Sequence, residues 1–97
     1  MITLFGKTVY KVLTIFKDGK RLVSPVYSFE YELGKIYSSK PGFYSYKDIE
    51  TARLLARKIT GNFKIGIYRC RIPWFSKYEV LGNGNILSKK IKIKERV

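Results

Sequence analysis

The sequence predicts an α+β fold, with a mainly antiparallel sheet of about six short strands and one α-helix packed on one face of it. Several segments rich in β-branched and aromatic residues are separated by turn residues, and one segment has apolar residues at helical spacing. The chain has 97 residues, 45% of them hydrophobic and 28% charged, which is typical of a folded domain with one core. We therefore expect a single small basic α+β domain over residues 1–97.

The first third of the chain predicts a hairpin followed by a half-buried strand. Residues 8–16 are β-branched and aromatic and contain no breaker, so they favour a strand. Asp18-Gly19 is a hairpin turn pair, and residues 21–23 would return until Pro25, which cannot donate to a ladder. Residues 26–33 alternate apolar and polar side chains, which predicts a strand with its acidic residues facing water.

The helix is predicted from about residue 46 to residue 60. A short strand at 36–37 and a turn ending at Pro41-Gly42 would precede it. Ser45 and Asp48 have the spacing of a capping box, and Gly61-Asn62 would end the helix in a left-handed cap. The apolar stripe that this helix would bury comprises Ile49, Ala52, Leu55, Ala56 and Ile59.

The last third of the chain predicts the centre of the sheet. Residues 63–72 favour a central strand, with Arg69 and Arg71 on one side and Cys70 on the other. A strand at 77–81 and a Gly-rich turn at 82–85 lead to a last strand or strand pair at 86–88 and 90–95. Lysines alternate with isoleucines in that last segment, which is typical either of edge protection or of a binding surface.

Composition argues against enzymes and metal proteins. The chain has no histidine and a single cysteine, so the commonest general base, a disulfide and a Cys-based metal cage are all missing. We expect Cys70 to be a small buried apolar side chain, and we expect no catalytic residues, no cofactor and no metal.

Four residues resemble the active-site elements of one enzyme class. Arg21, Ser24, Glu30 and Glu32 superficially resemble the Arg, Ser and Glu-x-Glu elements of ADP-ribosyltransferases. These residues lie too close together, on neighbouring strands, to form such an active site. The glutamates are better explained as the solvent-exposed face of a strand. We therefore predict that the protein is not an enzyme.

Charge is the most informative bulk property. Twenty Lys and Arg against seven Asp and Glu give a net charge of +13, which attracts polyanions whatever the fold. The same composition would also follow from an AT-rich genome or a thermophilic source. Biased composition and true polyanion binding therefore both stay open as explanations of the charge. No apolar run is long enough to span a bilayer, and the first seven residues do not have the pattern of a signal peptide. We expect no membrane partner and a cytoplasmic location.

Several short motifs together carry a family resemblance. They are Tyr31 to Tyr37 (Y-x-x-G-K-x-Y), Gly42 to Tyr46, Asp48 to Ala52 (D-x-x-x-A), Tyr68 to Pro73 (ending C-x-I-P), Gly82 to Gly84 and the basic segment Lys90 to Lys94. Over residues 20–95 the chain resembles an uncharacterised family of small phage, archaeal-virus and prokaryotic proteins. The resemblance implies a mobile-element origin, and hence the cytoplasm of a host cell, but its motifs are mostly structural ones: Gly34, Gly42 and Gly84 fit backbone requirements.

Two binding functions remain. The first is non-specific binding of nucleic acid, DNA or RNA, through Arg53, Arg57, Arg69, Arg71, Lys89, Lys90, Lys92 and Lys94, with Trp74 stacking on a base. For Trp74 and Phe75, a place in the core is the more favoured position. The second is an interaction protein that binds an acidic host protein or forms a homodimer through an edge strand at residues 86–94.

Overall fold

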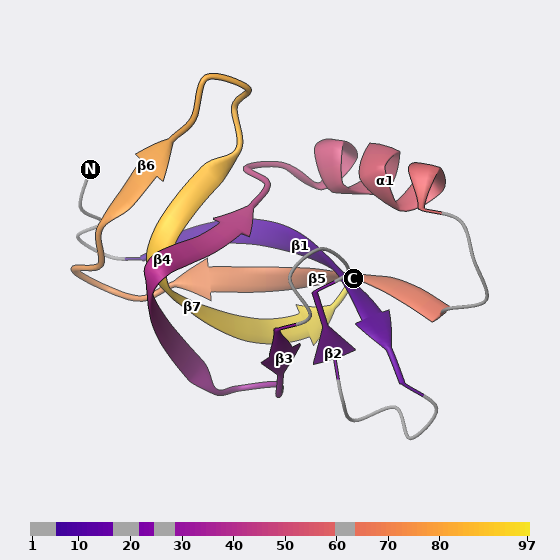
Figure 1. The fold of residues 1–97 in the computed structure, drawn as a ribbon, viewed down its shortest axis with the longest axis horizontal. Helices are drawn as coiled ribbons and strands as arrows, with labels where there is room; N and C mark the ends of the chain where they lie inside the picture. The colour runs from indigo at the N-terminus through magenta and orange to yellow at the C-terminus, as the bar shows by residue number, and fades with distance from the viewer. Residues whose placement is uncertain (1–5, 17–21, 25–28, 60–63) are drawn as a thin grey trace.

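The computed structural model describes residues 6–16, 22–24, 29–59 and 64–97, which form one curled sheet and one helix (Figure 1). The strands are β1 (Lys7–Ile15), β2 (Leu22–Val23), β3 (Glu30–Tyr31), β4 (Ile36–Ser45), β5 (Lys64–Ile72), β6 (Tyr78–Val80) and β7 (Ile86–Arg96), and the helix is α1 (Ile49–Lys58). The predicted α+β class with a mainly antiparallel sheet is confirmed.

The sheet curls because β1 is bridged to the end of β4, although these two strands are not neighbours in the strand order. The strand order is β3-β2-β1-β5-β7-β4, with β6 paired to β7, and every pairing is antiparallel. Just beyond the end of β4, Tyr46 exchanges two backbone hydrogen bonds of 2.8 Å with Tyr10 of β1. This bridge joins β1 to β4 outside the main ladder, and the sheet becomes a half-barrel with an inner and an outer face (Figure 1).

The hydrophobic core fills the inside of the half-barrel. Cys70, Ile91 and Ile93 are fully buried there, as the alternation of β5 and β7 predicts. The other buried core residues are Val9, Leu13, Ile15, Leu22, Tyr31, Phe43, Tyr68, Ile72 and Ile86. Aromatic rings form one wall, where Phe29 meets Phe43 and Tyr37 edge-on at centroid distances of 5.3 and 5.5 Å. Burying each large aliphatic side chain contributes about 1.5–3 kcal/mol, so this interior supplies most of the fold's stability.

Helix α1 begins later than the sequence predicts. Its N-cap is Asp48, whose Oδ1 accepts hydrogen bonds of 2.8 Å from the Thr51 backbone and hydroxyl. The expected capping box at Ser45 is wrong, because Ser45 still belongs to β4, where it pairs with Ile86 and is buried. At the other end the Ile59 amide donates to the Leu55 carbonyl at 3.2 Å, and the predicted cap at Gly61-Asn62 lies outside the described residues.

Asp48→Ala should destabilise the fold, lowering the folded-to-unfolded ratio a few-fold, because two donors of the first turn lose their acceptor. The hydrogen bond from the Thr51 backbone lowers the pKa of the Asp48 carboxyl, so the contribution of the cap is present near neutral pH and is lost as pH falls through that lowered pKa. Urea unfolding measures the effect. Ser45→Ala is the matched control: it removes a buried hydroxyl without a hydrogen-bond partner, and an equal or larger loss there would contradict Asp48 as the cap.

The predicted turn at Pro41-Gly42 is instead an irregularity inside one long strand. β4 pairs with β7 on both sides of it, but the register shifts between Ser38 and Phe43. Gly42 has φ +88°, and a Cβ there would come within 2.8 Å of the Ser88 carbonyl oxygen. A glycine at the bulge lets β4 bend without leaving β7, so the turn residues mark a corner of the sheet.

The final lysine-rich strand is not an edge. β7 pairs with β4 on one side and with β5 and β6 on the other, so the predicted edge at residues 86–94 is wrong. The expected segments 86–88 and 90–95 form this one strand, and pattern alone could not reveal that β6 and β5 share its second side. Edge protection therefore does not explain Lys92, which is paired with a strand on each side.

Other expectations are met within the described residues. β1 and β5 match the predicted strands at 8–16 and 63–72, and the turn at 82–85 is closed by a 2.8 Å hydrogen bond from the Leu81 amide to the Asn85 carbonyl. The strand expected at 26–33 is described only from residue 29, with β3 as its regular part and Leu33 exposed. Arg21, the Asp18-Gly19 turn and Pro25 lie outside the described residues.

The position of α1 follows from its contacts with β1 and β5. Ala52 is the fully buried residue of the helix. The expectation that α1 packs on one face of the sheet stays a prediction. In the part of the chain that the structure describes, no helix has the length and apolar character needed to cross a membrane.

Candidate nucleic-acid interface

The outer face of β5 carries two of the predicted arginines. Burial alternates along the strand: Tyr68, Cys70 and Ile72 are buried, whereas Arg69 and Arg71 are partly exposed. The sequence prediction that these arginines share one side, away from Cys70, is confirmed. Both side chains therefore project from the outer face of the half-barrel.

β7 adds lysines to the same face. Lys92 lies directly opposite Arg71, and Thr8 of β1 and Ile36 of β4 continue that row across four strands. Side chains opposite each other on adjacent strands have Cβ atoms about 4.5–5.5 Å apart. Lys90, two residues before Lys92, stands opposite Ser38 and is exposed. We call Arg69, Arg71, Lys90 and Lys92 the basic face.

The four cations of the basic face are not equivalent. Hydrogen bonds from Arg69 to the Tyr10 side chain and to Glu95 raise the pKa of this exposed arginine, and the Glu95 carboxylate offsets part of its charge. Arg71 lies close to the backbone of Gly6. A Cβ built on Gly6, which has φ +86°, would lie only 2.8 Å from Arg71 Nε. The guanidinium of Arg71 therefore lies over Gly6, where a larger residue would displace it.

Lys89 and Lys94 are exposed but stand outside this regular row. Lys89 Nζ donates to the Lys40 carbonyl at 2.7 Å, across the corner of β4. Lys94 falls at the register shift of β7, where Ile93 pairs with Cys70 and Glu95 with Arg69. Both add positive potential at the borders of the basic face, without a fixed place in it.

Two aromatic residues are exposed in the turn that follows β5. Trp74 is 60% exposed and Phe75 is 68% exposed, so the expectation that they belong to the core is wrong. The turn is closed by a 3.3 Å hydrogen bond from the Ser76 amide to the Pro73 carbonyl, and Ser76 is the buried residue of the segment. The turn thus buries its serine and presents both aromatic rings to solvent, three and four residues after Arg71.

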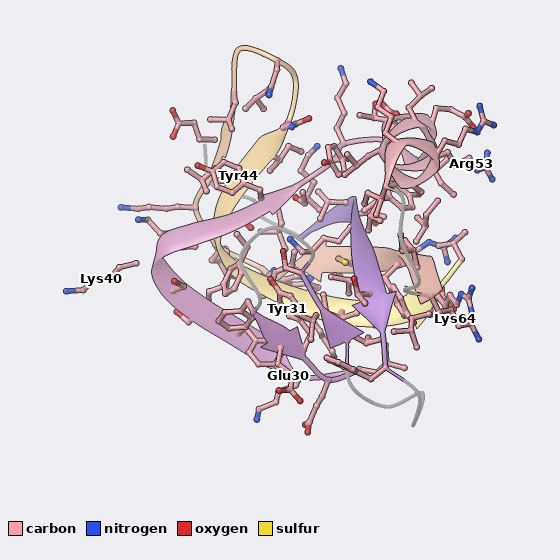
Figure 2. All side chains as sticks on the ribbon, turned by 45° about the vertical axis from the view of Figure 1, so that its right-hand side comes forward. Glu30, Tyr31, Lys40, Tyr44, Arg53 and Lys64 are labelled. Atoms are coloured by element: carbon pink, nitrogen blue, oxygen red, sulfur yellow. The ribbon has the colours of Figure 1, made fainter. Side chains whose placement is uncertain are left out.

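The predicted helix arginines form a separate group. Arg53 pairs with Glu50 at 2.6 Å, and Arg57 is exposed one turn later. Figure 2 shows Arg53 projecting outward from the helix, on the same side of the view as Lys64, which begins β5. α1 and β6, which follows the Trp74 turn, lie toward opposite ends of the long axis (Figure 1). The structure does not place the helix arginines in the cross-strand row.

Sequence reasoning missed one unusual residue, Lys11. It lies on the inner face of β1 between Val9 and Leu13 and is 7% exposed. Its amine donates a hydrogen bond to the Tyr44 carbonyl and lies 5.6 Å from the centre of the Tyr31 ring. The alternation of side chains along β1 could have revealed it, because Lys11 falls on the same side of the strand as the buried apolar residues Val9 and Leu13.

Burial changes the acid–base chemistry around Lys11. Desolvation lowers the pKa of the Lys11 amine to about 8, although nearby Cys70 acts in the opposite direction. Desolvation also raises the pKa of the Cys70 thiol to about 12 and raises that of the Tyr31 phenol. Figure 2 shows Tyr31 inside the curve of the sheet and Glu30 pointing away from it. The thiol and the phenol therefore stay protonated near neutral pH, as expected of core groups.

The residues resembling ADP-ribosyltransferase elements are separated by burial. Ser24 is buried just after β2, Glu30 and Glu32 are exposed, and Arg21 lies outside the described residues. Within the described ranges, no group of three or more His, Cys, Asp or Glu residues is placed to hold a metal ion. Comparisons with protein-family models, with curated proteins and with solved structures find no match.

Proposed function

We propose that the protein binds nucleic acid without sequence specificity, through the basic face and the adjoining Trp74 turn. The observation that carries this proposal is the cross-strand row in which Arg71 and Lys92 stand side by side, both partly exposed, on the outer face of the sheet. Two neighbouring cations of this kind attract an anion that can contact both of them. Phosphates are such anions, and they occur at regular spacing along a nucleic acid.

The chemistry of the face favours backbone contacts over base recognition. Arginine presents a planar fork that suits a phosphate, and the lysines act as flexible point charges. The net charge of +13 steers polyanions toward the protein and increases the rate of association. Contacts of this kind fix the position of a nucleic acid but do not select its sequence.

The biological setting is part of the proposal. From the sequence resemblance we infer a virus- or mobile-element-encoded protein that acts in the host-cell cytoplasm without catalysing a reaction.

Val12 and Ala52 are both buried but lie outside the main core cluster. We infer from this that α1 covers the outer face at Val12, so that the helix arginines border the basic face and contribute weaker, long-range attraction.

Fluorescence anisotropy with labelled DNA and RNA at a series of salt concentrations tests the proposal. If the four cations of the basic face each contact a phosphate, the logarithm of the association constant should fall with the logarithm of the salt concentration, with a slope of about −3 to −4. Undetectable affinity for both nucleic acids at low salt would contradict the proposal.

A second candidate function is an interaction protein, which the open side of β6 favours. β6 pairs with β7 alone among the described strands, and its exposed Val80 follows closely on the aromatic turn. An acidic host protein or a second copy of the chain could pair with the open side of β6, whereas β7, where the edge was predicted, already has strands on both sides. This candidate would replace the first if the salt series showed no nucleic-acid binding and light scattering showed a dimer.

A further inference from the structure

The strained backbone of the Trp74 turn calls for a functional explanation. Phe75 has φ +58° and is the only non-glycine residue among those described with a positive φ. It occupies the third position of a four-residue turn whose hydrogen bond joins Ser76 to Pro73. A positive φ at this position is normally supplied by glycine, and for a bulky residue it is a genuine outlier.

Packing does not account for the presence of Phe75. The residue is 68% exposed, so it buries too little apolar surface to offset the backbone strain. Glycine would relieve the strain at this position, and a polar residue would avoid an exposed ring. A strained and exposed aromatic residue therefore points to a role for the ring in binding.

Cations surround the turn on both sides. On the β5 side, Arg71 lies two residues before Pro73, and Lys92 lies opposite Arg71 on the neighbouring strand β7. On the β6 side, Lys77 is exposed, and its carbonyl accepts a 3.3 Å hydrogen bond from the Lys89 amide of β7. A nucleic-acid strand whose phosphates follow these cations would carry its bases to the level of Trp74 and Phe75.

We propose that Trp74 and Phe75 form a stacking platform for unpaired bases, so that the protein binds single-stranded nucleic acid in preference to duplex. This inference rests on the proposed function and specifies its ligand. In a duplex the faces of the bases are covered by their neighbours, whereas in a single strand they can stack on protein rings. Stacking tolerates any sequence because every base has a π-face, which agrees with a surface that lacks base-specific contacts.

The single tryptophan makes the platform directly observable. Trp74 is the only tryptophan in the chain, so its intrinsic fluorescence reports on this turn alone. Titration with oligothymidylate should quench that fluorescence, and a duplex of equal length should quench it less. Phe75→Gly should weaken single-strand binding about tenfold and leave duplex binding nearly unchanged, with a thermal midpoint equal to or above that of the wild type.

Phe16→Ala is the control, because Phe16 is an exposed aromatic residue that follows β1 directly, at the end of that strand away from the Trp74 turn. It should leave single-strand affinity unchanged. If single strand and duplex bind equally and Phe75→Gly has no effect on either, the stacking platform is wrong although the basic face remains. If the wild type binds neither form at low salt, the proposed function itself fails.

Discussion

Lys11→Met should give a stability difference from the wild type that changes by about 3 kcal/mol between pH 7 and pH 10.5. The free energy of unfolding of the variant, minus that of the wild type, should be highest at neutral pH and fall as pH rises. Methionine has nearly the length of lysine and carries no charge, so the substitution removes the ionisation and keeps most of the packing.

The sign follows from where the proton is lost. The amine of Lys11 has a pKa of 10.5 when exposed and about 8 in the folded protein, where burial disfavours its charge. Between these values the unfolded chain binds more protons than the folded one, so the wild type gains stability as pH rises. Well below pH 8 both states are protonated, and the folded wild type carries the full cost of a buried charge.

The difference between variant and wild type isolates this effect. Above pH 9 the raised pKa of Cys70 works against the fold, because the thiol ionises more readily in the unfolded chain. The raised pKa values of the Tyr31, Tyr46 and Tyr68 phenols do the same at higher pH. The phenol contributions are shared by both proteins and largely cancel in the difference, whereas that of Cys70 cancels only in part, because the Lys11 amine also lowers the pKa of the Cys70 thiol.

Urea unfolding followed by circular dichroism at a series of pH values measures the difference. Lys64→Met is the control, since it replaces an exposed strand lysine by the same residue. A Lys11→Met difference that is flat with pH, or one that Lys64→Met reproduces, would contradict a buried amine in the core. The Tyr44 carbonyl loses its hydrogen bond from Lys11 in the variant, which offsets part of the gain at neutral pH but not its pH dependence.

The parts of the fold that depend on local pattern could be predicted from the sequence. β1 follows from its run of β-branched and aromatic residues, and β5 with its side-chain alternation follows from the period-two pattern that one buried face imposes. The helix was placed but its start was not, because Ser45 and Asp48 both suit an N-cap and only the pairing of Ser45 with Ile86 decides between them. Local sequence does not contain that long-range pairing.

The candidate site was harder to predict because it depends on which strands are neighbours. Arg71 and Lys92 are 21 positions apart, and only the β5–β7 register brings them together. The same register makes β7 an interior strand, which no pattern of alternating Lys and Ile can distinguish from an edge. Trp74 and Phe75 were misplaced for a different reason: apolar character predicts burial, but in this turn the buried residue is Ser76.

The basic face makes the largest predicted contribution to binding. Arg71→Gln with Lys92→Gln should lower nucleic-acid affinity at low salt at least tenfold and reduce the salt slope by about 2, because two phosphate contacts are lost. Both substitutions keep a polar side chain of similar length, and circular dichroism would verify that the sheet is intact.

A salt series that compares this double variant with Lys58→Gln plus Lys64→Gln separates a defined binding surface from the effect of total charge. Both pairs lower the net charge from +13 to +11, since each removes two positive charges, and both control lysines are exposed. Lys58 ends α1 and Lys64 begins β5, at the end of that strand away from Arg71. We predict a large loss of affinity and a shallower slope for the Arg71 and Lys92 pair, with a small effect for the control. Equal losses in the two double variants would show that binding follows total charge, and would contradict a defined basic face.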